Sequence, residues 1–268
     1  MKTPRLKNLI PAFLTGLCIL LLPGCAAKTI WTTSLPFGPL EISGIVTEIR
    51  NQESRVQTFF STGRLNVKTG DSGYDYGILL VGTRKPITIR IEIFHSWGGP
   101  LLNILVNENG VRALSFPEKR FYTGKPEVFN LPELFHGTLD FAQLWGLVRG
   151  YPTLLKHARA ISPRGDQIDF INERGQTVQV MRFDKKAKLP RLISFPAQDT
   201  KILFSDFQNK DGIYYAKKIR LDYLVSQSEL TFNLKQTVLN QPIPEAVFEL
   251  KKPEGFKTVP IKKERKGS

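Results

Sequence analysis

Apolar and polar residues alternate with a period of two in several separate segments, and this pattern constrains the fold more than any other feature. In the clearest case, Ile87, Ile89, Ile91 and Ile93 alternate with Thr88, Arg90 and Glu92. Similar alternation occurs in residues 64–68, 218–223 and 229–235. Successive side chains of a strand point to opposite faces, so each segment predicts a strand with one apolar and one wet face. A parallel sheet buried on both faces would instead show unbroken apolar runs.

Short polar segments that contain Gly separate the expected strands. They occupy residues 69–73, 107–110, 172–175 and 209–212, and the last three are compact enough to predict hairpin loops. The 21 Gly and 18 Pro suit many short strands joined by turns. We expect about a dozen half-wet antiparallel strands, which must close into a barrel or curl around something apolar.

Two segments show helical spacing instead. Apolar residues recur from Ile42 to Phe60 at that spacing, which predicts an amphipathic helix over 40–60 that ends near Gly63. A second helix is predicted from Asp140, as N-cap, to Gly150. Its apolar face comprises Phe141, Leu144, Trp145 and Val148. A short helical turn is expected within 154–161, so the predicted class is α+β, mainly β with helices.

The first 25 residues predict export. Three cations precede an apolar run of 14 residues, Leu9–Leu22, which is too short for a membrane span but typical of a signal peptide. The run ends in Leu22-Pro23-Gly24-Cys25, which resembles a bacterial lipobox, in which the Cys is cleaved to the N-terminus and acylated. The alternative is a general signal peptide with a chance Cys. The only other cysteine, Cys18, would leave with the signal.

These features divide the chain into four parts. We expect a lipoprotein signal peptide (1–24), a lipidated N-terminus and tether (25–39), a folded domain (40–255) and a disordered basic tail (256–268). By resemblance to enteric lipoproteins, Ala26 after the Cys favours the outer membrane. The net charge of +14 falls to +11 when the three cations of residues 1–24 are removed, and a basic chain favours an anionic partner.

The sequence contains none of the common catalytic motifs. The sequence contains no G-x-S-x-G, H-E-x-x-H, P-loop or G-x-G-x-x-G motif, and its three His residues are scattered. We therefore expect no metal, no cofactor and no enzymatic activity, although a secreted enzyme with an unrecognised site is an alternative. Asp166 and Asp169 flank a strand start and are interpreted as solvated. Export argues against nucleic acid as a partner.

Two apolar segments are candidate contact sites. In residues 94–102, Trp97, Leu101 and Leu102 lie at or near a turn that contains Gly98, Gly99 and Pro100. Bulky apolar residues at a loop tip suggest contact with membrane or acyl chains, whereas the alternative is that they fold back into the core. The helix around Trp145 either covers the mouth of a cavity or simply packs on the sheet.

The order of these features resembles the LolA and LolB type of periplasmic lipoprotein carriers and receptors. The resemblance covers about residues 40–255: a helix, then Phe60-Ser61-Thr62-Gly63-Arg64-Leu65, an apolar Gly-containing loop, the segment Trp145–Pro152, and a closing stretch Asn240–Phe248. Because the domain follows a lipobox, the chain is more similar to the anchored receptor LolB than to the soluble carrier LolA, although its strand pair 178–195 resembles the carrier more closely. A gating Arg known in the carrier matches no single Arg here. The resemblance implies an unclosed antiparallel β-barrel with helices that lid an apolar cavity.

The function implied is a membrane-anchored protein that binds lipid or lipoprotein, and that receives or inserts acylated cargo at the periplasmic side of the outer membrane. Its expected partners are membrane lipid through acylated Cys25, the acyl chains of lipid or lipoprotein cargo, and a soluble carrier protein. Trp97, Leu101 and Leu102 are the candidate contact loop. Phe141, Leu144, Trp145 and Val148 are the candidate cavity or lid residues. The alternative is a structural or regulatory lipoprotein of the same fold that senses lipid or binds a protein.

Overall fold

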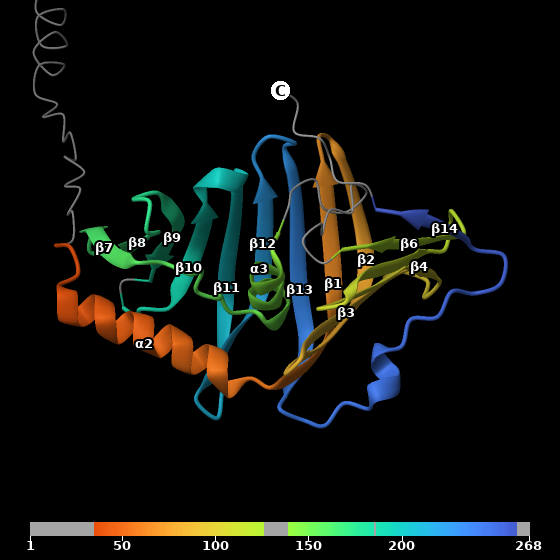
Figure 1. Ribbon diagram of the computed structural model, residues 1–268, viewed down its shortest axis with the longest axis horizontal. Coiled ribbons are helices and arrows are strands. Elements are labelled where there is room, and N and C mark those ends of the chain that lie inside the picture. Colours follow the sequence, from red (N-terminus) through yellow and green to blue (C-terminus); the bar gives the residue numbers. More distant parts are fainter. Residues whose placement is uncertain (1–34, 126–138, 185, 262–268) are drawn as a thin grey trace, which may run out of the picture. The chain divides into compact units, whose positions relative to one another are not determined.

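The computed structural model describes residues 35–125, 139–184 and 186–261, and its strands form one 14-stranded sheet (Figure 1). In chain order the strands are β1 (Thr58–Thr69), β2 (Ser72–Arg84), β3 (Ile87–His95), β4 (Pro100–Asn107), β5 (Gly110–Ser115), β6 (Arg120–Gly124), β7 (Arg159–Arg164), β8 (Gln167–Ile171), β9 (Thr177–Phe183), β10 (Pro190–Phe195), β11 (Thr200–Lys210), β12 (Ile213–Tyr223), β13 (Ser228–Leu239) and β14 (Lys257–Pro260). The strand order runs from β14 at one edge to β7 at the other, so the sheet is not closed. The predicted mainly β, unclosed barrel is confirmed, with 14 strands instead of about a dozen.

The sheet consists of two meanders that meet at its centre. Strands β1 to β6 are consecutive neighbours, as are β7 to β13, and β1 pairs with β13. All neighbouring pairs are antiparallel except β14 and β6, which run parallel. The three compact Asn- and Gly-containing loops form the β4–β5, β8–β9 and β11–β12 turns, as the sequence predicts.

Helix α2 (Pro39–Arg55) is shorter than the predicted helix. Pro39 occupies the first turn, where a missing N–H leaves no helical bond unmade, and Ile45, Val46 and Ile49 form the buried side. The chain becomes extended at Val56, and Phe60 belongs to β1. The predicted end at Gly63 is therefore wrong, because Val56 and Phe60 continue the helical spacing although they lie beyond the helix. Gly63 lies inside β1.

Helix α3 (Phe141–Arg149) has the predicted ends. The Asp140 carboxylate accepts the backbone N–H of Gln143, whose side chain accepts the backbone N–H of Asp140, each at 2.7 Å. Gly150 ends the helix with a φ of 78°, which favours glycine. The helical turn expected within 154–161 is wrong, because residues 152–157 are irregular and Arg159 begins β7.

The position of α3 follows from the strand order. Strands β6 and β7 lie near opposite edges of the sheet, so the connection that contains α3 must cross a face. On that face, the Trp145 and Phe59 ring centroids are 5.2 Å apart. We call this the α3 face; its core includes Ile78, Leu80 and Ile91, which are fully buried.

The chain crosses the opposite face after β13. Residues 240–256, which we call the strap, pass through the 3₁₀ helix η3 (Glu245–Phe248) to β14, and appear in blue in Figure 1. The strap contributes Leu250 to a small second core with Leu105 and Leu114. A further 3₁₀ helix, η2 (Pro196–Gln198), lies between β10 and β11.

The predicted disordered tail is partly ordered, and the predicted signal peptide and most of the tether lie outside the described residues. The disordered tail expected from residue 256 is wrong for Lys257–Pro260, which pair with β6. The signal peptide (1–24), Cys25 and the tether as far as residue 34 lie outside the described residues, as do residues 262–268.

Candidate functional site

The candidate contact loop is divided between surface and core. Trp97 is 77% exposed, whereas Leu102 is 6% exposed in β4 and Leu101 is half-buried against the main core. Leu102 therefore follows the core alternative, because β4 begins at Pro100 and its alternation turns Leu102 inward. A Cβ at Gly99 would overlap the Trp97 ring, so glycine there lets the ring fold over the turn.

Trp97 belongs to a row of aromatic rings. It stacks on His95 with ring centroids 4.9 Å apart and planes within 6°. The His95 ring in turn contacts Tyr76, and Tyr76 stacks on Tyr74. Partial burial, with a further contribution from Tyr74, raises the pKa of Tyr76. Arg64 and Lys235 line a hollow of about 200 Å³ together with Tyr76 and His95, so cations lie beside the rings.

Other exposed apolar residues lie at the same end of the sheet. Leu224 and Val225 lie in the turn between β12 and β13, and Val225 is 83% exposed. The register Thr69↔Ser228 places this turn beside the β1–β2 turn, and Tyr76↔His95 places the β3–β4 turn at that end too. Tyr76 also pairs with Leu65, four residues before Thr69, so the β3–β4 turn lies toward the same end of the sheet but several strands away from the β12–β13 turn. We call Tyr74, Trp97, Leu224 and Val225 the apolar end.

The four residues proposed to line or lid a cavity lie mostly in the packed core. Leu144, Trp145 and Val148 are at most 1% exposed, and Phe141 is half-buried. Helix α3 therefore packs on the sheet, which is the alternative interpretation of this segment. Residues 126–138, which precede it, lie outside the described residues.

Arg149, for which the sequence carries no local signal, is buried without a hydrogen-bond partner among the described residues. It is 2% exposed, and all three guanidinium nitrogens lack a partner. Its guanidinium carbon lies 4.9 Å from the Tyr151 ring centroid, which provides a cation–π contact. Burial lowers the pKa of Arg149 to about 10, although Tyr151 and Glu53 oppose the shift. The side chain is thus still cationic at neutral pH.

An open apolar groove of about 530 Å³ lies between the strap and the face opposite α3. The cross-strand pairs Phe60↔Val81 and Phe60↔Val238 place these three residues on one face, because Phe59 and Leu239 point to the α3 face. The apolar residues that line the groove include Phe60, Leu79, Val81, Val238, Ile243 and Val247. The sequence does carry a signal for it, since Ile78-Leu79-Leu80-Val81 is apolar on both faces.

One wall of the groove is fixed by Arg90. Its guanidinium donates to the strap carbonyls of Val247 at 2.7 Å and Glu249 at 3.1 Å. It also donates to the Glu92 carboxylate at 2.6 Å. Both ionisable groups beside the groove are therefore already paired.

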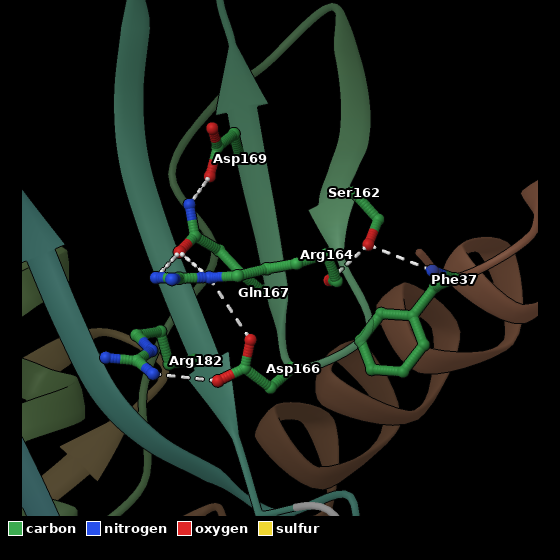
Figure 2. A network of polar contacts seen from close by, with 7 residues as sticks. All are labelled: Phe37, Ser162, Arg164, Asp166, Gln167, Asp169 and Arg182. Carbon is green, nitrogen blue, oxygen red and sulfur yellow. Dashed lines mark hydrogen bonds and ion pairs between the residues drawn. The ribbon is translucent and has the colours of Figure 1, made fainter. Parts of the chain in front are cut away.

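The acidic pair Asp166 and Asp169 forms part of a polar network (Figure 2). The Asp166 side chain is 14% exposed between Arg182, at 2.8 Å, and Arg164, at 3.2 Å. Asp169 accepts a hydrogen bond from Gln167. The interpretation of both as solvated is wrong, because arginines of β7 and β9 pair with Asp166 and Gln167 of β8 itself donates to Asp169. The Ser162 hydroxyl accepts the backbone N–H of Phe37, so the network holds the start of the described chain against β7.

The described residues contain neither a cluster of metal ligands nor a helix that could span a membrane. Within residues 35–125, 139–184 and 186–261, no three His, Cys, Asp or Glu side chains gather in a way that could hold a metal ion. No helix in the same ranges is long and apolar enough to cross a membrane.

Comparisons with known proteins give a likeness of fold. No protein-family model matches the sequence, and no curated protein matches it. A DUF1329 family protein from Desulfovibrio piger matches with a TM-score of 0.56 and 13% identity, over 78% of this chain and 97% of that chain. A Vibrio parahaemolyticus domain described as an outer membrane lipoprotein-sorting protein matches with a TM-score of 0.51 and 11% identity, over 76% of this chain and 94% of that chain. A LolA superfamily protein from Nitrosomonas europaea matches with a TM-score of 0.50 and 12% identity, over 78% of this chain and 97% of that chain.

The chain has the LolA/LolB-type fold. The resemblance stated from the sequence is confirmed at this level. Such low identity concerns the fold alone, so the roles of individual residues rest on the geometry of this chain. In this example of the LolA/LolB-type fold, the features available for contact are the apolar end and the groove beneath the strap.

Proposed function

We propose that this chain is a lipid-anchored protein of the bacterial envelope that binds acyl chains. In the finer form of the proposal it faces the periplasm from the outer membrane, where it receives or inserts acylated cargo, with a soluble carrier as a further partner. The LolA/LolB-type fold and the lipobox-like Leu22-Pro23-Gly24-Cys25 support it.

The observation that carries the proposal is the apolar end. Tyr74, Trp97, Leu224 and Val225 expose large apolar surfaces at one end of the sheet. Trp and Tyr rings are enriched where a membrane meets water, since each has an apolar body and a polar group. Arg64 and Lys235 beside the rings would attract anionic lipid. This combination suits shallow contact with a membrane surface.

The tether is long enough to allow such contact. Eleven residues, Ala26–Pro36, separate Cys25 from Phe37. Fully extended, such a chain spans about 40 Å. An acylated Cys25 would therefore keep the domain near the membrane while leaving it free to turn its apolar end toward the lipid.

We also propose that the chain is a binding protein without catalytic activity. Each CH₂ of an acyl chain removed from water contributes about 0.8 kcal/mol, so apolar area is what a lipid-binding protein has to provide. That requirement involves no set of catalytic polar groups.

The direct test uses a chain that begins at Ala26 and therefore lacks the lipid anchor. Its partition into anionic phospholipid vesicles is measured. We expect Trp97→Ala to weaken binding by about tenfold, because a buried aromatic ring contributes on the order of 1–2 kcal/mol. Leu40→Ala is the matched control, since Leu40 is 90% exposed on α2, which lies at the opposite end of the strands from the β12–β13 turn (Figure 1). Equal binding of wild type and Trp97→Ala would contradict membrane contact by this end.

The anchor has its own test. Cys25→Ser should abolish acylation of the full chain and release it into the soluble periplasmic fraction, because no other cysteine would remain after removal of residues 1–24. Metabolic labelling with a palmitate analogue and membrane fractionation measure the two effects. A Cys25→Ser chain that stays acylated and membrane-bound would contradict the lipobox.

One observation favours the second candidate, a structural or regulatory lipoprotein of the same fold. Leu144, Trp145 and Val148 are buried, so α3 fills part of the face on which a lipid cavity was expected. A filled core suits a protein that binds a partner through its surface. Native mass spectrometry of the purified chain separates the candidates, since co-purified lipid supports acyl-chain binding and its absence supports this alternative.

A further inference from the structure

We propose that the groove between the strap and the sheet binds one acyl chain of a membrane lipid. The site lies on the face opposite α3, so it is distinct from the cavity that the resemblance implied. The inference rests on the proposed function, because it names where an acyl chain would be held.

The walls of the groove are apolar on both sides. Strands β1, β2 and β13 would normally present polar side chains on a face that is not covered by a helix, but here they present Phe60, Leu79 and Val238, each half-buried. The strap faces them with Ile243 and Val247. A partly open apolar surface of this kind is a usual mark of a binding site.

The strap covers the two halves of this face differently. Over β4 and β5, the strap side chain Leu250 closes a small core with Leu105 and Leu114. Over β1 and β2, the strap leaves a groove of about 530 Å³, which lies within the usual range for small-molecule sites. The strap contains Pro242 and Pro244 there, and proline fixes its backbone φ. The open part is therefore a property of how the strap is built.

The groove suits a hydrocarbon chain better than a peptide or a free carboxylate. A bound peptide needs partners for its backbone N–H and C=O groups, yet β1 and β2 are already paired on both sides. A free carboxylate needs a cation, yet Arg90 is held by Glu92 and by two strap carbonyls. A hydrocarbon chain has neither need. The head group would remain outside the groove, which identifies the acyl chain of a membrane lipid as the occupant.

The test is photo-cross-linking of the full-length chain in phospholipid vesicles that contain a phosphatidylcholine with a diazirine on one acyl chain. Peptide mass spectrometry after irradiation should place the label on strap residues 241–247 and on the segments of β1 and β2 that line the groove. Ile243→Trp should lower this labelling at least fivefold, because the larger ring occupies the groove. Leu79→Trp, on the opposite wall, should act in the same direction.

Ala246→Trp is the matched control, since Ala246 is exposed in the same segment of the strap and does not line the groove. It should label like the wild type, and circular dichroism should show all three variants folded. Label confined to the apolar end or the α3 face would overturn the groove site while leaving the proposed function in place. No label anywhere beyond the tether would overturn both. Labelling of the groove by diazirine palmitic acid, but not by the phospholipid, would overturn a membrane lipid as the occupant.

Discussion

Two connections between strands cross the sheet, one on each face, and they cover its apolar side chains to different extents. On one face the connection from β6 to β7 folds into α3, seven of whose nine residues are buried. On the other face the connection from β13 to β14 stays mostly extended as the strap, and it encloses only part of the apolar surface beneath it. A helix presents side chains at a density that fills a face, whereas a single extended strand covers only a narrow strip.

The difference shows which face provides stability and which leaves surface for a ligand. Trp145, Leu144 and Val148 belong to the main core together with the inward residues of the strands. The strap is instead attached by Arg90 and a small second core around Leu250. Regions with few buried apolar contacts open at lower free energy than the global core. We therefore expect the α3 face to determine unfolding and the strap to move separately.

The largest expected effect is that of Trp145→Ala. Removing a fully buried Trp that packs on Phe59 should lower the free energy of unfolding by about 3–5 kcal/mol. Urea denaturation followed by circular dichroism measures the change. Phe141→Ala, on the same helix but half-buried, should lower it by less than half as much. Equal effects of the two substitutions would mean that α3 does not pack as tightly as its burial indicates.

The second effect concerns the strap. Arg90→Met should lower the free energy of unfolding by about 1–3 kcal/mol, because two hydrogen bonds to the strap are lost and Glu92 is left without its cation. Hydrogen exchange should accelerate in residues 241–250 more than in α3. Arg112→Met is the control, since Arg112 lies on the same face and makes no hydrogen bond or ion pair with the described residues. Uniform acceleration across the sheet would contradict separate opening of the strap.

The sequence predicted the sheet well because alternation is a local property of each strand. The ends of α3 were equally local, since Asp140, Gln143 and Gly150 satisfy the backbone groups at the ends of that helix. The end of α2 was missed because Val56 and Phe60 fit the period of a helix as well as that of the extended chain that they form. Both helix and strand patterns were present, and the long-range pairing of β1 with β13 decided between them.

The sites were harder to predict because they depend on segments far apart in the chain. The groove brings Phe60 and Leu79 against Ile243, more than 160 residues later, and only the apolar run Ile78–Val81 hinted at a cover on both faces. Leu102 was read with its neighbour Trp97 as part of one loop, although the strand begins between them. The burial of Arg149 had no local signal, since a cation in the last turn of a helix is ordinarily a favourable surface residue.

The smallest expected effect on stability is that of Arg149→Met. It tests whether the guanidinium buried on the α3 face lacks a partner in solution as well. Burying a cation without a hydrogen-bond partner is unfavourable, while Met keeps most of the aliphatic volume. Loss of the contact with Tyr151 offsets part of the gain, so stability near pH 8 should be unchanged or higher by about 1 kcal/mol.

Because burial lowers the pKa of Arg149 to about 10 in the folded state, the unfolded chain binds more protons above that pH. The stability of wild type relative to Arg149→Met should therefore rise as the pH increases through 10, and urea titrations at pH 8 and pH 10.5 measure this. A loss of more than about 2 kcal/mol in Arg149→Met at pH 8 would instead indicate an anion that accompanies the guanidinium in solution, since only a paired charge is that unfavourable to remove.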